Sequence, residues 1–290
     1  MFIDEHRERF GVEPICGVLE FSDKTYYARK RRPPSRREVD DERLLGEIRR
    51  VHEDSGSAYG SRRAWKQLRR EGIPAARCSV ERLMGRNGIE GAQHPRKRFL
   101  TVADEGAQRP ADLVNRAFKA TRPNQLWVCD LTYEKTYEGF VYLAFVLDVY
   151  SRLVVGWQTA DNLRADLVLD ALEMALHMRR PGAGELVHHS DRGSQYTAFR
   201  YTQRLADHGI ARSVGSVADA YDNAMAESFV STFKREAPSR PYRTRFDAEL
   251  GIARWIGWYN RDRLHSSLGD VPPLEFEAAF QVQTSRAQAA

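Results

Sequence analysis

The chain has 290 residues, which is enough for about two domains of ordinary size. Its hydrophobic content of 42% permits a substantial core, and its formal net charge is +5. The sequence has no run of about 18 uncharged apolar residues, and its charged start lacks the apolar core of a secretory signal. A membrane-spanning protein and a secreted one are therefore not expected, and a cytoplasmic location is the default expectation.

The three cysteines, Cys16, Cys78 and Cys129, are scattered along the chain and form no C-x-x-C pair. This pattern predicts neither a disulfide framework nor a zinc ribbon. We expect small buried thiols in a reducing compartment.

Positive charge is concentrated in the first part of the chain. Residues 1–120 carry a net charge of +7, whereas residues 121–290 carry −2. A polyanion such as DNA is one partner that this distribution fits. A solvated helical surface held by salt bridges is the alternative, and charge alone does not separate the two.

The first 90 residues are predicted to be helical. Residues 1–39 combine short helical segments, interpreted as helix, turn, helix, with a basic, proline-broken stretch at 29–37. Residues 40–90 predict a helix-turn-helix-like domain, since apolar side chains recur at helical spacing and a glycine-proline turn at 72–74 separates two basic segments. The candidate DNA-binding side chains of this domain are Arg62, Arg63 and Arg82. Many helical hairpins do not contact DNA, so this assignment stays open.

Periodicity is lost over residues 91–121, which we interpret as a linker. Residues 122–237 then alternate strand-like and helix-like segments. Three β-rich runs with short turns predict an antiparallel meander, which is followed by helix, strand, helix, strand and helix. We therefore expect a mixed α/β sheet with helices on its faces. Residues 238–290 are predicted to be a C-terminal helical extension of this core.

Three acidic residues stand out by their positions in the predicted elements. Asp130 is predicted to end one apolar strand, and Asp191 ends another strand just before a turn. Glu227 lies on a helix whose buried side is marked by Ala226 and Phe229, so it falls on the neighbouring polar side. Carboxylates at strand ends are well placed to face a crevice.

A cluster of three carboxylates has a defined chemical use. Such groups repel one another unless a cation neutralises them. Hard oxygen ligands of this kind favour Mg²⁺ or Mn²⁺. Two such ions about 4 Å apart can hold both the attacking and the leaving oxygen of a phosphoryl transfer. The hypothesis is therefore a metal-dependent enzyme that cuts or joins nucleic-acid strands.

Four ordered motifs surround these acids, and 35 residues separate Asp191 from Glu227. The motifs are Trp127–Tyr133 (WVCDLTY), His189–Tyr196 (HSDRGSQY), Tyr221–Ser228 (YDNAMAES) and the segment Tyr259–Glu277. With this spacing, the chain resembles the second-reading-frame (OrfB) DDE transposases of a large family of bacterial insertion sequences. Their catalytic core is similar to that of retroviral integrases.

The resemblance implies an RNase H-like catalytic core and DNA cleavage and strand transfer at insertion-sequence ends. By position it makes Asp130, Asp191 and Glu227 the catalytic residues and the ligands of two Mg²⁺ or Mn²⁺ ions. It places Lys234 near the DNA end. Asn223 and Gln195 follow as residues that contact DNA, and Asn260 and His265 as residues that line the site. For Asn260 and His265, local capping of a C-terminal helix is the alternative.

The partners that the resemblance implies are the terminal inverted repeats and target DNA. It also implies association with the bacterial nucleoid, at least a dimer on DNA, and an upstream-frame DNA-binding product as a fusion or a partner. Two alternatives remain, a nuclease that cuts without joining and a DNA-binding regulator with a degenerate core. A zinc hydrolase using His188 and His189 is disfavoured because neighbouring residues on a strand point to opposite faces.

Overall fold

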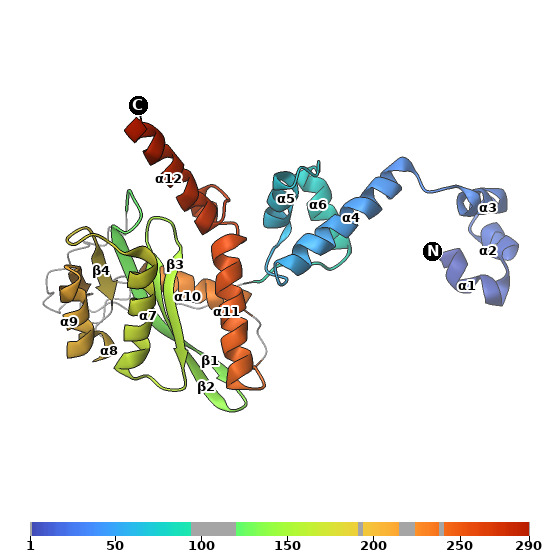
Figure 1. The fold of residues 1–290 in the computed structure, drawn as a ribbon. Helices are drawn as coiled ribbons and strands as arrows, with labels where there is room; N and C mark the ends of the chain where they lie inside the picture. Colours follow the sequence, from blue (N-terminus) through green and yellow to red (C-terminus); the bar gives the residue numbers. More distant parts are fainter. Residues whose placement is uncertain (1, 94–119, 191–193, 215–223, 238–240, 290) are drawn as a thin grey trace, which may run out of the picture.

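A computed structural model describes residues 2–93, 120–190, 194–214, 224–237 and 241–289. Figure 1 shows a small group of helices at the N-terminal end, a second helical unit, and an α/β core from which the last helix projects. In the part of the chain that is described, no helix is both long and apolar enough to span a membrane.

The N-terminal group contains α1 (Phe2–Phe10), α2 (Val12–Val18) and α3 (Asp23–Arg31). The sequence interpretation of helix, turn, helix matches α2 and α3, and α1 is an additional helix that ends before Gly11 at φ +74°. Ile15, Cys16 and Tyr26 form its small core together with Ile3. Because this core is so small, large apolar side chains such as Val18 remain exposed.

The second helical unit contains α4 (Arg36–Asp54), α5 (Ser61–Arg70) and α6 (Arg77–Arg86). Ser35 and Glu38 form a capping box that starts α4 after the proline-containing segment. The three helices enclose one apolar core, to which they contribute Ile48, Val51, Ala64, Leu68, Val80, Leu83 and Met84. The predicted helix-turn-helix-like region is thus confirmed as a three-helix unit.

Among the described residues, five strands form one sheet in the order β3-β2-β1-β4-β5. They are β1 (Leu126–Thr136), β2 (Gly139–Asp148), β3 (Val154–Ala160), β4 (Val187–Ser190) and β5 (Ala211–Val214). The first three are antiparallel, and β4 and β5 run parallel to β1. This arrangement confirms the predicted meander and the mixed sheet.

Side chains of β1 alternate between two separate cores. Leu126 and Val128 belong to one core, and Trp127 and Cys129 belong to the other. Such alternation is what a strand covered on both faces requires. Even-numbered residues of β1 therefore share one face of the sheet, and this face also carries Asp130.

The odd-numbered face is covered by α7 (Ala165–Arg179), α8 (Ser194–Thr197) and α9 (Phe199–Asp207). Helix α7 lies close to the sheet at Gly156, where an added Cβ would stand 2.2 Å from the carbonyl oxygen of Ala171. Glycine is required at this position because any side chain would push the helix away from β3.

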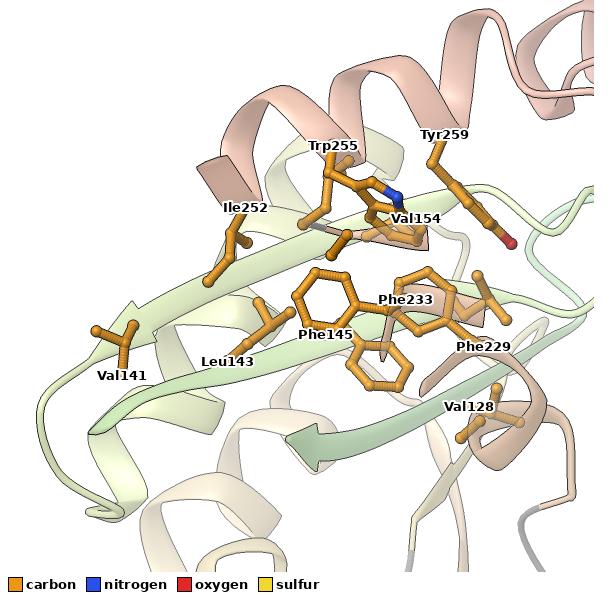
Figure 2. Close-up of a cluster of buried hydrophobic side chains, with 14 of the residues drawn as sticks. Val128, Val141, Leu143, Phe145, Val154, Phe229, Phe233, Ile252, Trp255 and Tyr259 are labelled. Atoms are coloured by element: carbon orange, nitrogen blue, oxygen red, sulfur yellow. The ribbon is translucent and has the colours of Figure 1, made fainter. Parts of the chain in front are cut away.

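The even-numbered face is covered by α10 (Ala224–Glu236) and α11 (Arg245–Arg261). Figure 2 shows aromatic side chains from both helices meeting above Phe145 of β2. Phe229 stacks on Phe145 with ring centroids 4.3 Å apart, and Trp255 and Tyr259 of α11 lie against Phe229. Helix α11 is thus part of the hydrophobic core on this face.

The last segment ties the parts together. After the 3-10 turn η1 (Ser266–Leu268), α12 (Pro273–Ala289) projects from the core, as Figure 1 shows. Glu277 near its start is buried and forms a two-pronged ion pair with Arg179 of α7. Upstream of η1, Leu264 is fully buried within the core of α4, α5 and α6. The helical unit and the α/β core therefore share a packed interface.

Candidate active site on the α10 face of the sheet

Asp130 lies in the middle of β1, opposite Phe145 of β2. The prediction that it ends a strand is wrong, because β1 continues to Thr136, which still pairs with Gly139. Only the apolar part of the strand stops at Asp130. The side chain is half-buried, and its Oδ1 accepts a hydrogen bond of 2.7 Å from the backbone of Leu131.

Strand β4 brings the residues before Asp191 next to β1. His189 pairs with Val128, and Cys129 Sγ lies 3.5 Å from the His189 carbonyl oxygen. Ser190, the last residue of β4, is buried. Asp191 and Asn223 lie outside the described residues.

Glu227 is exposed on the first turns of α10. The same side of this helix carries Lys234, seven residues further along. Lys234 Nζ contacts the carbonyl oxygen of Tyr133 and lies 3.0 Å from Glu134 Oε1, so this side of α10 runs along β1. Glu134 has an even number and shares its face of the sheet with Asp130.

Both carboxylates lie at a similar level along the strand. At the start of α10, Met225 contacts Arg152 of the turn between β2 and β3, so the helix runs in roughly the direction of β1. From Lys234 back to Glu227 the helix covers about 10 Å. From Glu134 back to Asp130 the strand covers about 13 Å. Counted from the contact between Lys234 and Glu134, Asp130 and Glu227 therefore lie at a similar level along β1.

His188 and His189 are both fully buried, and their rings contact different elements. His188 Nε2 lies 3.0 Å from the Tyr201 hydroxyl of α9, whereas His189 Nδ1 lies 2.9 Å from Ser213 Oγ of β5. Burial and the neighbouring His189 lower the pKa of His188 to about 3. Both rings are thus packed in the interior, His188 against α9 and His189 against β5.

Gln195, Asn260 and His265 occupy three separate places. Gln195 Nε2 donates to the carbonyl oxygen of Leu163 at 3.4 Å. The Asn260 amide bonds both the N–H and the C=O of Val154, each at 3.0 Å, and so joins α11 to β3. His265 is buried beside Arg263 and stacks edge-on against Tyr259. The contacts of Asn260 and His265 tie elements of the scaffold together.

The three arginines predicted to contact DNA also differ in their surroundings. Arg62 is exposed on α5. Arg82 of α6 pairs with Asp41 of α4 at 2.6 Å. Arg63 lies 3.0 Å from Glu236 Oε1, at the end of α10. Only Arg62 of these three thus presents an exposed side chain.

A buried ion cluster around Glu236 was not predicted from the sequence. Arg263 donates two hydrogen bonds to this carboxylate, at 2.5 and 2.8 Å, and Arg235 lies 3.2 Å from it. Burial alone would raise the pKa of Glu236, but the hydrogen bonds from Arg263 and the charges of Arg263 and Arg63 lower it to about 2. A glutamate on a predicted helix gives no signal of this kind, because its partners are distant in sequence.

The described residues contain no group of three His, Cys, Asp or Glu side chains that could hold a metal ion. The class of protein is given by family models that match the α/β core, in which a mixed sheet is covered by helices on both faces. The model "Integrase core domain" matches residues 120–220, and a second one of the same description matches residues 208–273. An "HTH-like domain" model matches residues 39–98, over the α4–α6 unit.

Relatives over nearly the whole length identify the family. The chain is 46% identical over 274 residues to a Mycobacterium tuberculosis protein assigned as the transposase for insertion sequence element IS986/IS6110, covering 92% of this chain and 99% of that protein. It is 44% identical over 284 residues to the transposase for insertion sequence element IS629 of Shigella sonnei, covering 96% and 95%. The chain therefore belongs to the family of insertion-sequence transposases with an integrase core domain.

Solved structures with a partly similar course of the chain come from retroviral integrases. The catalytic core domain of HTLV-2 integrase in complex with magnesium has a TM-score of 0.39 at 14% identity, covering 55% of this chain and 98% of that chain. A chain of the simian T-cell lymphotropic virus intasome has a TM-score of 0.46 at 13% identity, covering 79% and 74%.

Proposed function

We propose that Asp130, Asp191 and Glu227 are the catalytic carboxylates with which this transposase cleaves DNA at insertion-sequence ends and transfers the strands. The observation that carries the proposal is the course of α10. Its Lys234 side lies against β1, and this places Glu227 over the face of the sheet that bears Asp130.

Connectivity supports Asp191 as the third carboxylate. Ser190 ends a strand that is parallel to β1 and adjacent to it. Asp191 follows directly, and neighbouring Cα atoms are about 3.8 Å apart. The residue directly before Asp191 therefore belongs to the strand next to the one that carries Asp130.

The donor set fits a divalent cation with hard oxygen ligands. Asp130 on β1 and Glu227 on α10 carry carboxylate oxygens, and Glu227 is exposed to solvent. Asp130, Asp191 and Glu227 would hold two Mg²⁺ or Mn²⁺ ions. When bound, such ions supply charge neutralisation for an in-line displacement at phosphorus.

The other residues of the site position the substrate. Lys234 is 37% exposed and lies about two helical turns from Glu227, so its ammonium can exchange Glu134 for a phosphate of the DNA end. We assign Gln195 and Asn223 to contacts with the same DNA end. The α4–α6 unit supplies a second DNA contact through Arg62. The DNA ligands of the protein are the terminal repeats and target DNA. Two copies of the chain bind one pair of ends.

The decisive experiment measures strand cleavage and strand transfer on a duplex that ends in the terminal inverted repeat. Asp130→Asn, Asp191→Asn and Glu227→Gln each remove one charge and retain the size of the side chain. We expect each variant to lose both activities while its affinity for the duplex stays near that of the wild type. Full activity in any of the three would refute the assignment. Cleavage without transfer by the wild-type protein would instead identify a nuclease.

A further inference from the structure

Three surfaces or clusters outside the catalytic carboxylates stand out: the exposed apolar side chains of α1–α3, the groove beside Trp65 and Asp270, and the buried cluster around Glu236. Only the cluster connects two functional parts of the chain. Glu236 is the last residue of the helix that carries Glu227, and Arg63 belongs to the α4–α6 unit.

We propose that Arg63 is a positioning residue, which clamps the helical unit onto the catalytic helix through Glu236. This inference rests on the proposed function, because it assigns to Arg63 a part in aligning bound DNA with the carboxylates. The sequence predicts that Arg63 contacts DNA, and this proposal assigns it to an ion pair within the protein instead.

The first support is the burial of the acceptor. The side chain of Glu236 is fully buried, and that of Arg263 is 4% exposed. A buried carboxylate is stable only when hydrogen bonds and opposite charges surround it. Arg63, Arg235 and Arg263 supply both, and Arg63 is the one contributed by the helical unit.

The second support is the packing around the ion pair. The Arg63 guanidinium lies 5.8 Å from the centroid of the Tyr59 ring, on the same unit. The Tyr59 hydroxyl accepts from the Leu264 N–H at 2.8 Å and lies 3.2 Å from the Asp262 carbonyl oxygen. Leu264 fills the core of α4, α5 and α6. Arg63, whose side chain is 28% exposed, therefore lies at the edge of a packed interface.

The third support is the direction in which the clamp acts. Glu236 lies nine positions after Glu227, which is about 14 Å along one helix. An α-helix of this length behaves as a stiff element, so a tilt of the helical unit at Glu236 displaces Glu227 as well. A site displaced by about 1 Å loses much of its catalytic rate.

Neighbouring arginines provide a matched pair of variants. Arg63→Met removes the clamp, and Arg62→Met removes an exposed charge from the same turn of α5. We expect Arg63→Met to bind the terminal-repeat duplex with wild-type affinity and wild-type salt dependence. At saturating DNA we expect its cleavage rate to fall at least tenfold, with cuts at additional positions. Arg62→Met should instead weaken binding and reduce the salt slope by about 0.9, because it removes a proposed DNA contact. Arg63→Lys should restore most of the rate.

Two results would overturn the clamp. A salt slope reduced by about 0.9 in Arg63→Met would identify Arg63 as a phosphate contact. Wild-type rate and cut position in Arg63→Met would show that the ion pair positions nothing.

A measurement without DNA separates this proposal from the proposed function. In urea unfolding, the midpoint shift of the Arg63→Met/Glu236→Gln double variant should be smaller than the sum of the two single shifts, since both remove the same contact. Additive shifts would contradict the clamp even in a protein that cleaves no DNA. If Arg63→Met does not fold, Arg63→Gln, which also removes the charge, takes its place in the same cycle.

Discussion

Two buried histidines make the stability of the protein depend on pH. His188 is fully buried and His265 is 8% exposed. Burial lowers the pKa of both rings to about 3, helped by the charge of His189 at His188 and of Arg263 and Arg63 at His265. The folded rings are therefore neutral at pH 5, whereas in the unfolded chain their pKa is 6.5.

The direction in which the free energy of unfolding changes with pH follows from proton uptake. Below pH 6.5 the unfolded chain binds protons that the folded chain does not, so the contribution of each ring is fully present above pH 6.5 and declines as the pH falls toward 3. Each ring lowers the free energy of unfolding by about 1.4 kcal/mol per pH unit once the pH is well below 6.5. Together they give a slope that approaches about 2.7 kcal/mol per unit near pH 5.

Urea unfolding at constant ionic strength between pH 7.5 and pH 5 measures this slope. His265→Gln should halve it, whatever the variant does to stability at neutral pH. His177 is exposed on α7, so His177→Gln is the matched control and should leave the slope unchanged. An undiminished slope in His265→Gln would refute the assignment of a buried, neutral ring.

Three further predictions concern packing and metal. Gly156→Ala should lower the free energy of unfolding by about 1–3 kcal/mol in thermal denaturation, because its Cβ would meet the backbone of α7 at Ala171. Leu264→Ala should cost about 2–5 kcal/mol in urea unfolding, since the removed side chain is fully buried in the α4–α6 core. Chelation of divalent ions should abolish strand cleavage but not DNA binding, and added Mg²⁺ should restore cleavage; cleavage that persists in chelator would contradict the metal assignment.

Local patterns along the sequence were enough to predict the order of the elements in the core. The apolar runs of β1 and β2 and the short turn between them predict their pairing, because the partners are close in the chain. The extent of β1 was harder to predict. Beyond Asp130 the strand carries polar side chains such as Glu134 and Lys135, and it stays paired with β2 as far as Thr136. Hydrophobic patterning therefore placed Asp130 at a strand end, although it lies in mid-strand.

Contacts between distant segments could not be predicted in the same way. Arg63 and Glu236 are 173 positions apart, and each occurs in a segment with ordinary helical patterning. A basic residue on a helix-turn-helix-like unit is first assigned to DNA, because the exposed and the ion-paired arginine look alike in sequence. Burial of the partner separates them, and burial depends on how the C-terminal segment returns to α5.

The placement of Glu227 explains why its helix is fixed at several points. A metal-binding carboxylate must reach solvent, so its own side chain cannot contribute to the core that holds the helix. Phe229, two residues later, anchors the helix in the core instead, since it is buried against β2 and α11. Lys234 holds the same helix to β1, and Glu236 fixes its last turn to the helical unit. The catalytic acid that we propose on α10 thus depends on side chains on either side of it. Substitutions at Phe229 or Glu236 should lower the rate of cleavage more than the affinity for DNA.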